Sequence, residues 1–113
     1  MGQLIVHADG EYASESRACL IEMGNELGAK EFCSQQRAAM NRGDYSGLLD
    51  KIKCPTAIIC GLNDIITPPS GSQYLAEHIN NALLVELPGC GHLLPLEQPR
   101  RSTQFLQEWL KAE

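Results

Sequence analysis

Two short apolar segments limit the folds that are open to this chain. Residues 56–60 read TAIIC, residues 82–87 read ALLVEL, and a connection of about 20 residues separates them. The first is a continuous apolar run closed by Gly61, which is typical of a strand that is buried on both faces, and the second is a further apolar strand. The connection is long enough for a helix, which we expect from Pro69 to Ile79. The two strands are therefore predicted to be parallel and joined by a right-handed crossover.

The first half of the chain is predicted to be helical, without a strand. A helix is expected to begin at Ser14 and to end at Gly28, which can serve as its C-cap. Its apolar positions follow the i, i+3, i+7 spacing and are Leu20, Met23 and Leu27. A second helix is expected over residues 30–42, followed by a short helical turn over residues 46–52.

A last amphipathic helix is expected from Glu97 to Lys111. Its apolar residues, which repeat on one face, are Phe105, Leu106, Trp109 and Leu110. Glu97 suits the positive end of this helix, and Pro99 suits its first turn. We therefore expect a helical segment over residues 1–52 and a β-α-β-α segment over residues 53–113.

Charge and cysteine content argue against several classes of protein. The net charge is −5, and no basic cluster exceeds the pair Arg100–Arg101, so a footprint for nucleic acid or an anionic membrane is missing. No apolar run approaches the ~20 residues that a membrane span needs. The five cysteines include no C-x-x-C and predict neither a disulfide framework nor a common zinc pattern. We expect reduced, buried thiols, which favour a cytoplasmic location. Cys90 and His92 form at most half of a metal site, because no second pair at ligand spacing accompanies them.

The loops that follow the two strands carry the candidate chemistry. Asp64 comes just after the first strand, and His92 comes just after the second. Ligands of open α/β sheets bind outside the carboxyl ends of the strands, where such loops meet. A carboxylate beside an imidazole fixes the tautomer of the ring and stabilises its protonated form, so His92 is a candidate general base.

The two strand-and-loop segments, CPTAIICGLNDIITPP and NALLVELPGCGHLLPLEQP, resemble the C-terminal part of an α/β-hydrolase. In that family a G-x-x-D loop supplies the acid of a catalytic triad, and a G-H-x-x-x-x-E-x-P loop supplies its histidine. The first loop is matched by Gly61 and Asp64, and the second by Gly91, His92, Glu97 and Pro99.

This resemblance is close over residues 48–113, and residues 14–47 look like the end of the helical cap that such enzymes carry. It implies a partial α/β-hydrolase fold, in which a helical cap remnant precedes a parallel β-α-β-α unit. It also implies an esterase-like activity on a small ester or a related acyl or carbon–carbon substrate, with Asp64 and His92 as catalytic residues. No metal or organic cofactor is implied.

The nucleophile of that family lies on a G-x-S-x-G elbow that precedes the cap. None of the seven serines has glycine at both the −2 and +2 positions, and Ser70 is expected to begin a helix. We therefore expect the triad to be incomplete within this chain, which alone should be inactive. Cys90 as a substitute nucleophile is disfavoured, because it is only two residues from His92.

Two parallel strands form a poor independent sheet, because parallel sheets are usually covered on both faces and their edges need partners. We expect this chain to form a homo-oligomer or to pair with a complementing N-terminal hydrolase half. The alternative is a non-catalytic module, derived from a hydrolase, that serves self-association or partner binding.

Overall fold

The structure is a computed structural model that describes residues 5–112. Within that range the sheet has two parallel strands, β1 (Ala57–Gly61) and β2 (Leu83–Leu87). Their register pairs Ala57 with Leu83 and Gly61 with Leu87, so both strands end at the same edge. The prediction of two parallel strands is confirmed.

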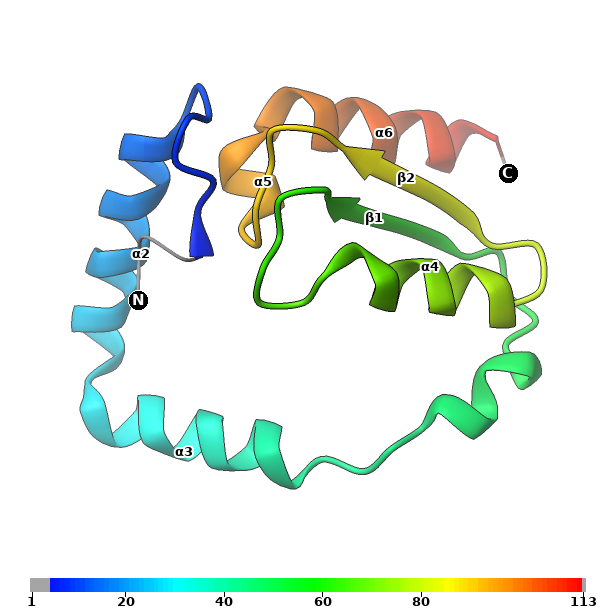
Figure 1. Cartoon of the computed structure of the whole chain (residues 1–113), viewed down its shortest axis with the longest axis horizontal. Helices are drawn as coiled ribbons and strands as arrows, with labels where there is room; N and C mark the ends of the chain where they lie inside the picture. Colours follow the sequence, from blue (N-terminus) through cyan, green and yellow to red (C-terminus); the bar gives the residue numbers. More distant parts are fainter. Residues whose placement is uncertain (1–4, 113) are drawn as a thin grey trace.

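The connection between the strands forms α4 (Pro69–His78), which packs against both of them. Pro69 is the first residue of this helix, where its missing N–H leaves no hydrogen bond unmade. After β2 the chain forms a single turn, α5 (Leu94–Glu97), and then α6 (Pro99–Lys111). In Figure 1, α4 lies below the two strands and α6 lies above them.

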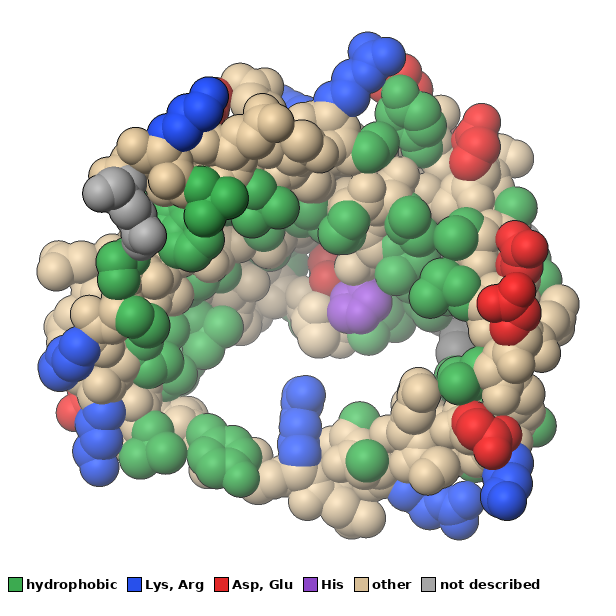
Figure 2. Space-filling model, turned by 180° about the vertical axis from the view of Figure 1, so that it is seen from behind, with side chains coloured by type: hydrophobic (Ala, Val, Ile, Leu, Met, Phe, Trp, Pro, Cys, Tyr) green, Lys and Arg blue, Asp and Glu red, His purple; other side chains and the backbone are tan. Residues whose placement is uncertain are grey.

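The helical segment that precedes β1 forms an arm around an opening. It consists of α2 (Ala13–Leu27), α3 (Ala29–Asn41) and the 3-10 helix η1 (Ser46–Lys51). Gly28 joins α2 to α3 with a φ of +80°, a conformation that side chains other than glycine rarely adopt. Figure 1 shows the arm leaving the α5 region and returning to β1 on the far side. The space-filling view in Figure 2 shows the opening that the arm encloses.

The buried core lies where the two strands meet α5. Leu87, Cys90 and Leu94 form it, and Ile59 and Val85 pack against it. The helices contribute less to the core than their apolar patterns predict. Met23 of α2 is 55% exposed and Leu110 of α6 is 64% exposed, because no second layer covers these faces within the described residues.

The boundaries of the helices and strands fall within two residues of the predicted ones, and the largest shift is at the start of the last helix. The last helix begins at Pro99 rather than at Glu97, which instead ends α5. The described residues contain no helix with the length and apolar character that spanning a membrane requires. The division at residue 52 stays a prediction.

Candidate active site

Hydrogen bonds hold together the two loops that follow the strands. The Asn63 N–H donates to the Cys90 carbonyl oxygen at 2.9 Å, and the Asn63 side-chain oxygen accepts the Gly89 N–H at 2.9 Å. A Cβ atom on Gly61 would collide with the carbonyl groups of Cys90 and Gly91. Glycine at position 61 therefore permits the close approach of the two loops.

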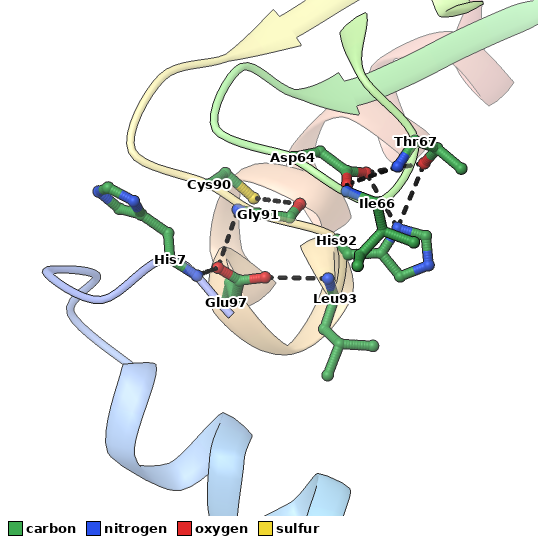
Figure 3. A network of polar contacts seen from close by, with 9 residues as sticks. All are labelled: His7, Asp64, Ile66, Thr67, Cys90, Gly91, His92, Leu93 and Glu97. Atoms are coloured by element: carbon green, nitrogen blue, oxygen red, sulfur yellow. Dashed lines mark hydrogen bonds and ion pairs between the residues drawn. The ribbon is translucent and has the colours of Figure 1, made fainter. Parts of the chain in front are cut away.

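The loops bring Asp64 and His92 into contact, although 28 positions separate them in the sequence. The distance between Asp64 Oδ2 and His92 Nδ1 is 3.0 Å (Figure 3). The Thr67 hydroxyl donates to the same Asp64 oxygen at 2.9 Å and lies 3.2 Å from His92 Nδ1. Thr67 therefore contacts both members of the pair, a role that its place in the sequence did not suggest.

Asp64 is 8% exposed, yet its surroundings favour the ionised form. Burial raises the pKa of Asp64, but hydrogen bonds from the Thr67 N–H, from His92, from the Thr67 hydroxyl and from the Ile66 N–H lower it. The hydrogen bonds outweigh burial, so the pKa of Asp64 lies below its ordinary value of 3.8. Asp64 therefore carries a negative charge at neutral pH.

An ionised carboxylate can only accept hydrogen bonds, so His92 donates to Asp64 through Nδ1–H. This leaves the lone pair of a neutral imidazole on Nε2. The His92 side chain is 35% exposed, and its hydrogen bonds within the described residues use Nδ1 and not Nε2. The arrangement has the parts of a general base, which are an oriented ring, a charge partner and a nitrogen with a lone pair.

Glu97 lies on the other side of the His92 loop and is 1% exposed. The sequence suggested that Glu97 favours the start of the last helix, but its carboxylate instead accepts hydrogen bonds from three backbone N–H groups. The donors are His7 at 2.8 Å, Gly91 at 2.9 Å and Leu93 at 2.9 Å. Two of these donors flank His92. The signal that pointed to Glu97 was its fixed spacing of five residues after His92.

Cys90 is fully buried, and its thiol donates to the Gly91 carbonyl oxygen at 3.8 Å. Burial, together with the nearby charges of Glu97 and Asp64, raises the pKa of Cys90 to about 12. The thiol is therefore protonated at neutral pH, which disfavours Cys90 as a nucleophile. Within residues 5–112, no three His, Cys, Asp or Glu side chains are grouped so as to hold a metal ion.

The serines of the described residues lie in other surroundings than the Asp64–His92 pair. No serine hydroxyl there forms a hydrogen bond with His92, and Ser70 lies in the first turn of α4, as predicted. Ser102 is buried in α6, where its hydroxyl donates to the Gln98 carbonyl oxygen at 2.8 Å.

A comparison with known families places most of this chain in one of them. A family model described as "alpha/beta hydrolase fold" matches residues 13–99. Among curated proteins, monoacylglycerol lipase ABHD6 of Mus musculus is 39% identical over 64 residues. That match covers 57% of this chain and 19% of the lipase, so the chain spans about a fifth of the length of that relative.

Solved structures agree with this comparison. A thermophilic esterase from Thermogutta terrifontis is 40% identical, with a TM-score of 0.61 over 64% of this chain and 26% of the esterase. The esterase EaEST from Exiguobacterium antarcticum is 19% identical, with a TM-score of 0.76 over 97% of this chain and 40% of the esterase. The second likeness concerns the fold alone and extends over the helical arm as well as the sheet.

Proposed function

This chain belongs to the α/β-hydrolase fold family, and on that premise we propose that Asp64 and His92 are the acid and the base of a Ser-His-Asp triad. The observation that carries the proposal is the 3.0 Å contact between Asp64 Oδ2 and His92 Nδ1 at the edge where both strands end. The exposure of His92 supports it, since a base must reach its substrate.

In the proposed reaction, His92 Nε2 takes the proton of a serine hydroxyl while the serine oxygen attacks the carbonyl carbon of the substrate. The imidazolium gives this proton to the leaving group, and Asp64 stabilises the positive charge in the meantime. In the second half, Nε2 takes a proton from water, whose oxygen attacks the acyl carbon. The acyl product then leaves, and the proton returns to the serine oxygen.

The substrate class that we propose is a small ester, with a related acyl or carbon–carbon substrate as a variant. The similarity to a monoacylglycerol lipase and to a thermophilic esterase supports an ester. We further propose that the serine lies outside these 113 residues, because no serine within them fits the G-x-S-x-G elbow.

A chimera tests this proposal by supplying the rest of the fold. Residues 48–113 replace the aligned segment of the Thermogutta terrifontis esterase, and hydrolysis of p-nitrophenyl acetate is measured. The chimera should be active, and His92→Ala within it should lower kcat by about 10³-fold or more. The control is His78→Ala, because His78 lies exposed on α4 and should be dispensable.

The chain alone provides a second control, since without a nucleophile it should form no stable adduct with a fluorophosphonate probe. A folded chimera that lacks activity, or one that keeps full activity after His92→Ala, would contradict the proposal. A stoichiometric adduct on one serine of the chain alone would contradict the proposed origin of the nucleophile.

The alternative function is a non-catalytic module that associates with itself or with a partner. The observation that favours it is the exposure of apolar side chains on α6, where Leu106 is 49% exposed and Leu110 is 64% exposed. Scattered apolar residues are normal on protein surfaces, but neighbouring ones on one helix face favour association. An inactive chimera together with a stable oligomer would support this alternative.

A further inference from the structure

The carboxylate of Glu97 is almost fully buried and forms no ion pair within the described residues. Removing a carboxylate from water is costly unless hydrogen bonds replace the lost hydration. Glu97 accepts hydrogen bonds from three backbone N–H groups, and these bonds replace the lost hydration. A buried charge that is satisfied only by backbone donors holds those donors in place in return.

The donors lie on both sides of His92. Oε1 of Glu97 accepts the Gly91 N–H and Oε2 accepts the Leu93 N–H, each at 2.9 Å. The N–H of His92 itself donates to the Ile5 carbonyl oxygen at 2.8 Å. Three successive N–H groups of the loop therefore have fixed partners, and the direction in which the His92 side chain leaves the backbone is fixed with them.

Glu97 also connects this loop to the segment that precedes the helical arm. Its Oε1 accepts the His7 N–H at 2.8 Å in addition to the Gly91 N–H. A Cβ atom on Gly91 would lie 2.8 Å from the Ile5 carbonyl oxygen and 2.9 Å from the His7 nitrogen. Glycine at position 91 therefore lets the segment Ile5–His7 pack directly against the loop, with one carboxylate oxygen bridging the two.

From these contacts we infer that Glu97 is a positioning residue, which holds the imidazole of His92 against Asp64 and couples it to the segment Ile5–His7. The inference rests on the proposed role of His92 as a base. It extends that role, because the orientation of the base then depends on a segment 85 or more positions earlier in the chain.

The test is nuclear magnetic resonance spectroscopy of the whole chain with the Glu97→Gln substitution. The amide nitrogen of glutamine would face a backbone N–H where an oxygen had accepted one, so at least one donor loses its partner. We expect loss of the downfield Nδ1–H resonance of His92 and about tenfold faster exchange of the Leu93 amide hydrogen. The matched control is Glu108→Gln, which makes the same charge change at an exposed position of α6 and should preserve both signals.

A folded Glu97→Gln variant that keeps the His92 resonance would overturn the inference. If that variant does not fold, amide hydrogen exchange of the wild-type chain is the test. If the amide hydrogens of His7, Gly91 and Leu93 exchange with the same opening free energy, the coupling is supported. If their opening free energies differ, the inference is overturned. Neither measurement uses a substrate or a nucleophile, so failure here is distinguishable from failure of the chimera.

Discussion

At the scale of the single residue, the charge of Asp64 links the stability of the fold to pH. The pKa of Asp64 is lowered in the folded chain from 3.8, so the ionised carboxylate stabilises the fold above about pH 4. This contribution is lost as the pH falls through the lower, folded-state pKa. Asp64→Asn should reduce the free energy of unfolding by about 1–3 kcal/mol at neutral pH, and should weaken the loss of stability on acidification.

Urea unfolding at a series of pH values measures both effects of this substitution. Asp50→Asn is a suitable control, because Asp50 is exposed on η1 and its side chain has no hydrogen bond within the described residues. If Asp64→Asn left the acid branch of the stability curve unchanged, the pKa of Asp64 would be the same in the folded and the unfolded chain, which contradicts the prediction.

A residue of the site is predictable from the sequence when the pattern that identifies it lies within a few positions of it in the chain. Asp64 and His92 each follow an apolar strand within a few residues, so local pattern and the geometry of parallel strands suffice to bring them together. The link between Glu97 and His7 is not predictable in this way, because the two residues lie 90 positions apart. A glutamate near a helix start also has an equally good local explanation in the helix dipole.

At the scale of the helix and the strand, glycine and proline made most boundaries predictable. Pro69 begins α4 and Gly28 ends α2, as expected from the backbone limits of these residues. Which helix faces are buried was not predictable, because the apolar pattern of α2 or α6 says nothing about what lies opposite. Met23 and Leu110 fit the helical period, and both are nevertheless exposed.

The closeness of the two loops leads to a prediction about Gly61. A Cβ atom at this position would meet backbone atoms of Cys90 and Gly91, which cannot rotate away as a flexible side chain would. Gly61→Ala should therefore lower the free energy of unfolding by about 1–3 kcal/mol. It should also lengthen the Asp64–His92 contact, because both side chains depend on these loops.

Thermal unfolding measures the stability change, and the His92 Nδ1–H resonance reports on the contact. Gly71→Ala is the matched control, because a Cβ atom on Gly71 in α4 meets nothing within 4 Å. That change should be neutral or stabilising by about 0.5–1 kcal/mol, since alanine favours a helix interior. Equal stability of the two variants would show that the loops yield to accommodate the methyl group.

At the scale of the whole molecule, the chain is more open than a compact domain of its length. Its radius of gyration is 15.6 Å, compared with about 13 Å expected for a compact domain of this size. The opening inside the arm and the thin core both contribute to the difference (Figures 1 and 2). An open arrangement buries little apolar surface relative to the chain entropy lost on folding, so further burial by association would stabilise it.

We therefore predict that the purified chain is not a compact monomer and that α6 contributes to its association. Leu110→Glu should reduce the associated fraction in sedimentation velocity experiments, because a charge on an exposed apolar face opposes burial of that face. Gln107→Glu adds the same charge to an exposed polar position of α6 and should have little effect. A compact monomer at all concentrations would contradict the prediction, and it would require the arm to close over the sheet and remove the opening seen here.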